Sequence, residues 1–524
     1  MKRKLLVALA LAFSFYAVAQ EEKEMCHPLD VADNLQYNVE VQGNFSSGKT
    51  PLWMNANRYG LSSLDEINGY VRAGVERPLA TDSLRKWGVG YGVDVALPYN
   101  FTSDVVVQQA FVEGRWLAGA LSIGSKQYAM EMKNNRLSSG SQAFGINARP
   151  VPQVRLSLPE YWTIPGTNYW VHVKGHIAYG KMTDQHWQHD FTNRQQSYTD
   201  NLLYHSKAGY VMIGKEDCYY PLSLEVGLEM ASTFGGTAHV LQLDGSMLTF
   251  EGNKDAKAYW NAFVPGGSDA GETNYKNTNG NQIGSWMARV NWDSDTWRFS
   301  MYADKFFEDH SSMFQMDYDG YGEGDEWKEK KKHRYLVYDF KDMMLGGELH
   351  FKYGSLLRHI LLEYIYTKYQ SGPIYHDHTP NVKDHVGGND NFYNHYIYPG
   401  WQHWGQVMGN PLYRSPLYNE DGAIEVYDNR FKALHLGVDG EYDNFAYRLL
   451  GTWQEGVGSY HHPYTKAHHN FSMLFESTWN FNKGALKGWR ISGAYGMDLG
   501  AIQGNNYGVQ FTIAKHGLFK ENNK

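Results

Sequence analysis

The stretch WGVGYGVDVALPY, residues 87–99, decides the fold class because large apolar side chains alternate along it with small or polar ones. A period of two is the mark of a β-strand whose two faces have different surroundings. Glycines suit a confined lumen, whereas the polar face of a soluble sandwich usually carries long charged side chains. The length suits a tilted membrane-crossing strand. Trp87, Val89, Tyr91, Val93, Val95 and Leu97 form the apolar face, and Gly88, Gly90, Gly92, Asp94 and Ala96 form the other.

Strands of this kind recur along the chain, and short turn sequences such as Asp443-Asn444 join several of them. Aromatic residues favour the strand ends, as in the interfacial girdle of outer-membrane barrels. Roughly 17 to 19 segments qualify, and the even parity of bacterial barrels favours 18. The sequence therefore predicts an all-β fold, a transmembrane antiparallel β-barrel of about 18 strands whose lumen is occluded by long loops. The clearest further segments are 170–180, 222–232, 284–292, 297–307, 433–442, 445–454, 470–481 and 489–500, with a closing strand in 505–519.

The N-terminus has the features of a secretory signal peptide, since Lys2, Arg3 and Lys4 precede an apolar run and a small-x-small cleavage site. Its removal makes the formal net charge of −8 more negative, which disfavours a nucleic-acid partner. Cys26 and Cys218 could form one bridge or stay apart. The predicted divisions are a signal peptide (1–19), an N-terminal periplasmic segment (20–35), the outer-membrane β-barrel with its extracellular loops (36–519) and a polar tail (520–524).

Strand parity assigns loops to the two membrane sides when it is followed backward from a last strand that ends in the periplasm. As far back as about residue 282, successive loops alternate between the two sides in agreement with their lengths. At 181–203 the count assigns the loop to the wrong side, so one segment between 204 and 282, near Gly235-Gly236, is miscounted. The predicted periplasmic turns are 442–445 and 482–488, and the predicted outer loops are 251–282, 307–334, 370–430 and 456–469.

The stretch NHYIYPGWQHWGQVMGNPLYRSPLYNEDG, residues 394–422, is crowded with aromatic rings but has neither helical nor strand periodicity. An exposed loop of this composition suits sugars, which need apolar faces beside a few placed polar groups. The alternative is that the loop folds inward as a plug and the rings form its core. On the first interpretation the candidate polysaccharide-binding residues are Trp401, Trp404, Asn410, Tyr413, Arg414 and Asp421.

The same loop carries a family resemblance, together with DNRFKALHLGVDGEY, YRLLGTW, GVGSYHHPY, TPLWMNANRYGLSS, NGYVRAGVERPL and GINARPVPQVRLSLPEYWTIPG. These stretches run from about residue 37 to 516, and the chain resembles the capsule-assembly Wzi family of Bacteroidetes-type bacteria. The resemblance implies an occluded 18-stranded barrel in the outer membrane that binds capsular polysaccharide and supports capsule assembly or retention. It implies a lectin-like, non-catalytic role. The expected partners are a capsular or other surface polysaccharide and outer-membrane lipid, with polysaccharide export machinery as a further candidate, and no cofactor is expected. It transfers no binding residue.

Catalytic and metal-binding patterns are weak in this sequence. It contains neither G-x-S-x-G nor H-E-x-x-H, and Glu225 and Glu229 lie on the expected lumen side of one strand, so we expect no enzyme. His376, Asp377, His378, Asp384, His385 and Asp390 have metal-ligand chemistry without an established zinc spacing, and we expect a solvated loop and no metal.

Two further features bear on partners. The run EGDEWKEKKKHR, residues 323–334, would attract an acidic polymer, although most charge runs are only solvated. The alternative function is an outer-membrane porin or channel for small solutes, for which long loops are unfavourable because they rarely lack a fold or function of their own. The charged side chains expected to face inward are Asp94, Lys174, His176, Arg289, Glu441 and Arg448.

Overall fold

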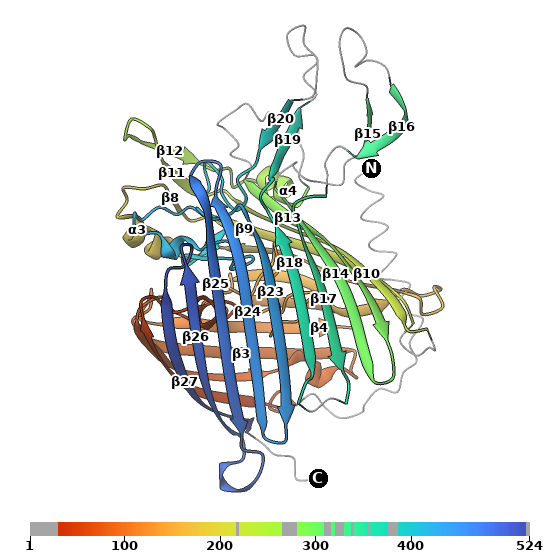
Figure 1. The fold of residues 1–524 in the computed structure, drawn as a ribbon. Coiled ribbons are helices and arrows are strands. Elements are labelled where there is room, and N and C mark those ends of the chain that lie inside the picture. The colour runs from red at the N-terminus through yellow and green to blue at the C-terminus, as the bar shows by residue number, and fades with distance from the viewer. Residues whose placement is uncertain are drawn as a thin grey trace.

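The computed structural model describes residues 30–215, 220–264, 280–308, 316–319, 330–336, 340–353, 356–375 and 386–519. Eighteen antiparallel strands form one closed sheet (Figure 1). They are β1 (Gln36–Ser47), β2 (Ile67–Arg77), β3 (Trp87–Tyr99), β4 (Val106–Trp116), β5 (Gly119–Ser125), β6 (Gln153–Thr163), β7 (Val171–Lys181), β9 (Leu203–Ile213), β10 (Leu222–Phe234), β13 (Asn281–Asp293), β14 (Trp297–Glu308), β17 (Met343–Phe351), β18 (His359–Tyr366), β23 (Phe431–Tyr442), β24 (Phe445–Gly458), β25 (Pro463–Asn480), β26 (Trp489–Gly500) and β27 (Asn506–Leu518).

The barrel closes because β1 pairs with both the second and the last strand. Gln42 stands opposite Tyr70 on β2 and opposite Thr512 on β27, so neither terminal strand leaves an unpaired edge. Each other strand pairs with its neighbours along the chain. The predicted antiparallel barrel of 18 strands is thus confirmed.

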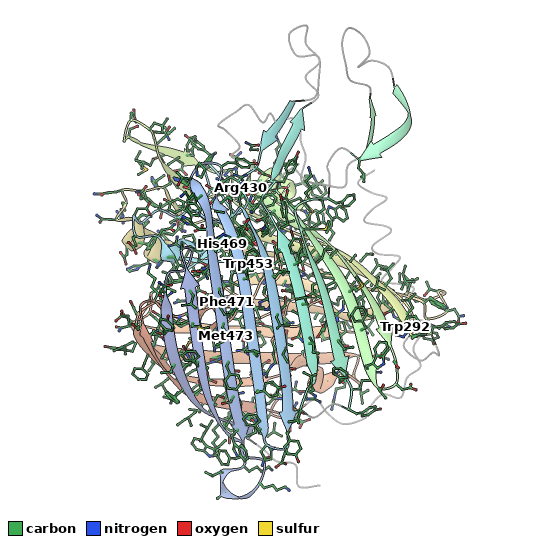
Figure 2. All side chains as sticks on the ribbon, in the orientation of Figure 1. Trp292, Arg430, Trp453, His469, Phe471 and Met473 are labelled. Atoms are coloured by element: carbon green, nitrogen blue, oxygen red, sulfur yellow. The ribbon has the colours of Figure 1, made fainter. Side chains whose placement is uncertain are left out.

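The alternation in β3 sorts its side chains between the membrane and the lumen. Trp87 and Leu97 are 65% and 61% exposed on the outward face, whereas Asp94 is buried inside. The glycines allow close packing, since a Cβ at Gly92 would lie 2.7 Å from the Phe111 ring. Figure 2 shows outward side chains along β24 and β25, among them Trp453, Phe471 and Met473. This apolar outer surface is the one that lipid requires.

The two rims of the barrel differ in loop length. One carries the short connections 443–444 and 294–296, the other the long ones such as 126–152 and 367–430. Outer-membrane barrels have short periplasmic turns and longer extracellular loops, so the long-loop rim faces outward. The order of the barrel strands puts the connections within 251–282, 307–334 and 370–430 at the long-loop rim and those within 442–445 and 482–488 at the other, as the strand count predicted; in place of 456–469 only 459–462 connects β24 to β25.

The miscounted segment is also identified. Residues 182–202 lie on the long-loop rim, because β11 (Thr237–Leu241) and β12 (Met247–Glu251) are not barrel strands. With β8 (Tyr198–Asp200) they form a separate three-stranded sheet, in which the central strand β11 pairs with both β12 and β8. Gly235 and Gly236, with φ of +64° and +66°, turn the chain out of β10 at this point.

The remaining elements are short and belong to the long-loop rim or to its inward folds. Among described residues, no helix is long and apolar enough to cross a membrane. The elements are α2 (Leu52–Asn55), α3 (Gln185–Thr192), α4 (Ala256–Phe263), the 3-10 turn η4 (Pro416–Tyr418), and the strand pairs β15 (Met316–Asp319) with β16 (Lys330–Leu336), β19 (Ser371–Tyr375) with β20 (Val386–Asn389), and β21 (Gln402–His403) with β22 (Gln406–Val407). At the short-turn rim lie η2 (Leu79–Asp82) and η5 (Gly484–Leu486).

Several predictions fall outside the described residues. They concern the signal peptide 1–19, the tail 520–524, the two cysteines, and most of the charge run 323–334. The same holds for His376, Asp377, His378, Asp384 and His385 of the histidine-rich loop.

Candidate functional site

Three loops from distant parts of the sequence fold back into the barrel, and we call them together the plug: 48–66, 126–152 and 391–430. Their side chains form one buried cluster with the inner wall, which includes Trp53, Leu137 and Trp401. Loop 126–152 enters the lumen between β5 and β6, where β5 is only 7 residues long. The lumen is therefore occupied by protein at mid-height.

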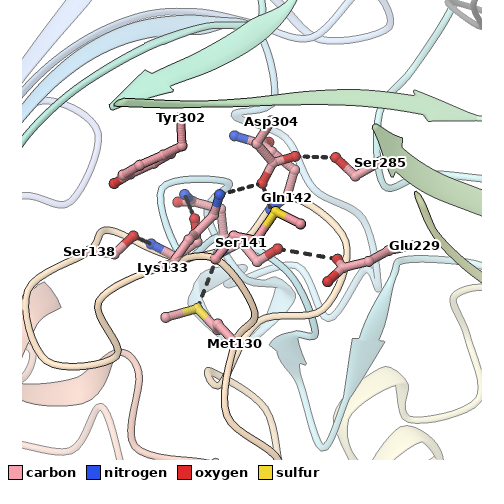
Figure 3. A network of polar contacts seen from close by, with 12 residues as sticks. Met130, Lys133, Ser138, Ser141, Gln142, Glu229, Ser285, Tyr302 and Asp304 are labelled. Carbon is pink, nitrogen blue, oxygen red and sulfur yellow. Dashed lines mark hydrogen bonds and ion pairs between the residues drawn. The ribbon is translucent and has the colours of Figure 1, made fainter. Parts of the chain in front are cut away.

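Loop 126–152 is fixed to β14 by a buried ion pair (Figure 3). Lys133 Nζ lies 2.8 Å from Asp304 Oδ2, and both side chains are fully buried. The ammonium also lies 4.9 Å from the centre of the Tyr302 ring. Asp304 accepts further hydrogen bonds from the Gln142 backbone N–H at 3.1 Å and from the Ser285 hydroxyl. A buried carboxylate needs such partners, because an unpaired charge in the interior is costly.

Other wall carboxylates hold the same loop from different strands. Glu363 on β18 accepts hydrogen bonds from the Ser138 hydroxyl at 2.6 Å and from the Ser139 backbone N–H at 2.8 Å. The Tyr302 hydroxyl also donates to this carboxylate. Glu348 on β17 accepts from Asn134 Nδ2 at 2.7 Å. The wall carboxylates Asp304, Glu348 and Glu363 thus accept hydrogen bonds from the plug.

Three of the six predicted binding residues form the contact between the two larger plug loops. Trp401 Nε1 donates to the Ala143 carbonyl at 3.3 Å, and Asn410 Nδ2 donates to the Gly140 carbonyl at 3.0 Å. The Tyr413 hydroxyl donates to Gln142 Oε1 at 2.9 Å. Trp401, Asn410 and Tyr413 have no exposed surface, because their rings and polar atoms are used inside the plug. Their contact with a polysaccharide stays a prediction and would require the loop to leave the lumen.

The other three predicted residues lie nearer the outer rim. Trp404 is half-buried, with the Arg149 guanidinium 4.3 Å from its ring centre. Arg414 donates to Asn419 Oδ1 at 3.1 Å, and exposed Asp421 accepts from the Tyr427 hydroxyl at 2.6 Å. The structure therefore divides the six candidates into an inner and an outer group, and binding by the outer group stays a prediction.

The groups that hold the plug were missed by sequence reasoning. Lys133 and Asp304 are 171 positions apart in the chain, and no local pattern joins them. The available signal was the segment MKNNRLSSGSQAFGINARP, residues 132–150 with Met130 and Glu131 before it, which is polar, rich in small residues and free of strand alternation. Such a segment within a barrel is an inward loop as readily as an outer one. The predicted inward placement of Asp94, Lys174, His176, Arg289, Glu441 and Arg448 is confirmed.

His395 in the third plug loop should make the stability of the plug depend on pH. Its Nδ1 accepts the backbone N–H groups of Ile397 and Tyr398, both at 3.1 Å, and burial lowers its pKa to about 4 from the usual 6.5. The unfolded chain takes up a proton below about pH 6.5 and the folded chain only near pH 4. The contribution of His395 to the free energy of unfolding should therefore fall as the pH falls across that window, by up to about 3 kcal/mol, and be constant above it.

The test is urea unfolding in detergent between pH 7.5 and 4.5, with His395→Gln beside the wild type. The variant should lose that part of the pH dependence, because glutamine can accept a hydrogen bond but does not titrate. His186→Gln, whose imidazole is 84% exposed, should behave as the wild type. Identical pH profiles for the wild type and His395→Gln would contradict the assignment.

Two cavities remain beside the plug. One of about 330 Å³ lies towards the short turns and is lined by charged side chains, among them Arg58, Arg136, Arg448 and Glu476. The other, of about 200 Å³, lies between loop 126–152 and the inner face of β6, β7 and β9.

Comparisons with known proteins agree with this architecture. The sequence matches no protein-family model and no curated protein. Among solved structures it is similar to Wzi of Escherichia coli, described as an outer-membrane, carbohydrate-binding β-barrel involved in group 1 capsule assembly, with a TM-score of 0.52 and 11% identity over 92% of this chain and 85% of that one. OccAB3 of Acinetobacter baumannii matches with a TM-score of 0.44 and 9% identity over 93% of this chain and 100% of that one. OccK8 (OprE) of Pseudomonas aeruginosa matches with a TM-score of 0.44 and 6% identity over 93% and 98%. At these identities the similarity concerns the fold, and the chain is an 18-stranded β-barrel of the outer membrane.

Proposed function

We propose that this barrel is a Wzi-type protein that binds a surface polysaccharide, capsular in kind, and supports capsule assembly or retention at the cell surface. The observation that carries the proposal is the plug. Because it fills the lumen, the long-loop rim is the surface that is left for binding the polysaccharide. The role is non-catalytic and needs no cofactor. Export machinery for the polysaccharide is the further partner that such a role would bring.

The buried polar contacts between the plug and the barrel wall argue against a diffusion channel. A solute path needs continuous water across the barrel, but here fully buried Lys133 and Asp304 form an ion pair at mid-height. Opening a path would separate the plug from several wall carboxylates, including Glu363. A porin is the second candidate, favoured by the charged cavity of about 330 Å³ at the periplasmic side.

The long-loop rim offers the chemistry that sugars need. Arg430 lies with its guanidinium 3.6 Å from the centre of the Tyr460 ring, and Tyr396 is 47% exposed. Asp421 and Tyr427 form an exposed polar pair nearby in the chain. Flat rings beside fixed donors and acceptors can hold the C–H faces and the hydroxyls of a saccharide.

The proposal predicts that a strain lacking this protein releases its capsule. Cell-bound polysaccharide should fall and released polysaccharide should rise, while total synthesis stays constant, because only the surface anchor is lost. The measurement is a quantitative sugar assay of washed cells, medium and the sum of both. An unchanged amount of cell-bound polysaccharide in the deletion strain would contradict the anchor role and make the channel the better candidate.

Complementation then tests the rim. Trp404→Ala should restore retention only in part, since loss of one ring contact of ~1.4 kcal/mol weakens binding about tenfold. Tyr169→Ala is the matched control, because Tyr169 is 68% exposed in a turn of the opposite rim. Both variants should reach the outer membrane in equal amount. Full retention with Trp404→Ala would remove this residue from the proposed surface.

A further inference from the structure

The cavity of about 200 Å³ is lined by a cation, Arg155, that has no hydrogen-bonded or ion-paired partner among the described residues. Arg155 projects from β6 and stacks over the Tyr128 ring at 3.9 Å. Among described residues no hydrogen bond or ion pair reaches its guanidinium, and its Nε is fully buried. Arg155 is half-buried, and a guanidinium that lines a cavity without a hydrogen-bonding partner is well placed to bind an anion there.

The other cations around the cavity are already partnered. Lys126 Nζ lies 2.6 Å from Glu113 Oε1, and Lys174 is paired with Glu131. Arg149 donates to the hydroxyls of Ser103 and Thr102, each at 2.9 Å. Arg155 is therefore the one cation on this cavity's described lining that lacks a hydrogen-bond acceptor, and its recorded contact is the stack on Tyr128.

The lining limits what the anion can be. A planar guanidinium binds a carboxylate through two parallel hydrogen bonds. Because Glu131 also lines the cavity, each further negative charge on the ligand is unfavourable, which favours a monoanion over a dianion such as phosphate. The rings of Tyr204 and Tyr210 supply flat walls, and Ser157 and Ser206 lie on the lining as hydroxyl partners. The space equals about six or seven water molecules, which suits a single sugar-sized molecule and not a polymer segment.

We propose that this cavity binds a monocarboxylate of the size of one sugar ring, a uronic acid or a similar hydroxy acid, with Arg155 as its anchor. The ligand is either a free acid or the terminal residue of an acidic saccharide, and both share the same carboxylate chemistry. The inference goes beyond the proposed function, because it holds whether or not a polymer is retained at the outer rim.

The test is calorimetric titration of the purified full-length barrel in detergent, in a buffer without carboxylate or phosphate. Glucuronate should bind at least about tenfold more tightly than glucose, because only the acid can pair with Arg155. Arg155→Gln should abolish this preference. Arg448→Gln, in the other cavity, should leave it unchanged.

Further arms protect the test from a folding defect and separate the ligand sources. Heat-modifiable mobility should show that each variant still forms the barrel, and Arg155→Lys, which keeps the charge but lacks the planar fork, should retain an intermediate preference. Binding of glucuronate itself supports a free acid, and binding only of an oligosaccharide with terminal glucuronate supports a polymer end. Absence of any preference for glucuronate over glucose together with no binding of the oligosaccharide, tighter binding of inorganic phosphate, or an undiminished preference in folded Arg155→Gln would overturn the proposal. These results come from purified protein, so they are distinguishable from a failed capsule-retention assay on cells.

Discussion

Replacement of residues 131–147 by a short Gly-Ser linker should turn a barrel that passes no current into an ion channel. An 18-stranded wall encloses an aqueous lumen once nothing fills it. The deletion also removes the partners of the third plug loop, since Trp401 and Tyr413 lose the groups to which they donate. We therefore expect stepwise conductance in planar bilayers, where the wild type should show none.

The new channel should prefer cations. Lys133 leaves with the deleted segment, and the wall carboxylates Asp304 and Glu363 lose their plug partners and face water. A lumen lined by carboxylates attracts cations, which a reversal potential in a KCl gradient measures. The control is the same linker in place of 482–487, an exposed turn without lumen contact, which should create no current. Wild-type conductance equal to that of the deletion would contradict the occluded lumen.

Lys133→Met should give the largest loss of stability among single substitutions in the plug. It leaves Asp304 as a buried charge without its cation, and breaking a buried pair in this way costs about 3–5 kcal/mol. The measurement is the free energy of unfolding by urea in detergent, with limited proteolysis of loop 126–152 as a local readout. The matched control is Lys352→Met, whose partner Asp293 is 43% exposed and whose ion pair should contribute no more than about 1 kcal/mol.

A second substitution separates the charge from the packing. Asp304→Asn in the Lys133→Met background removes the unpaired carboxylate but keeps acceptor capacity for Ser285 and for the Gln142 backbone N–H. The double variant should therefore recover part of the stability lost in Lys133→Met. A double variant less stable than either single one would mean that the pair is not the source of the effect.

The barrel wall was predictable because its information is local. The alternation in residues 87–99 predicts a β-strand, its length and the face of the sheet on which each side chain lies. The same pattern recurs often enough along the chain to predict the number of strands. The miscount near Gly235-Gly236 arose because 237–241 and 247–251 are also short β-segments, and whether they join the barrel depends on pairing with Tyr198–Asp200, far earlier in the chain.

The interior was only partly predictable. The composition of 394–422 allowed either a sugar-binding surface or a plug, and the contacts that place Trp401 and Asn410 inside are made with carbonyls of residues 140–143. Every residue has a backbone carbonyl, so the sequence does not show which carbonyls accept the hydrogen bonds of Trp401 and Asn410. Arg155 shows the same limit, since nothing about an arginine on an alternating strand tells whether an acceptor will stand opposite it.

The plug ties the first extracellular loop to strands near the end of the chain, and this bears on the order of folding. Trp53 Nε1 donates to Thr452 Oγ1 at 3.0 Å, and Asn147 Nδ2 donates to the Val407 carbonyl at 3.1 Å. Contacts separated by 399 and 260 residues cannot form before most of the chain has inserted, and such non-local contacts slow folding. Until then β1 and β27 are open edges that can pair with other chains. The pairing of β1 with β27 and the docking of the plug should therefore be late steps that depend on each other. A half-assembled barrel is then at risk of aggregation through its open strand edges, and it does not yet form a closed pore that could conduct ions.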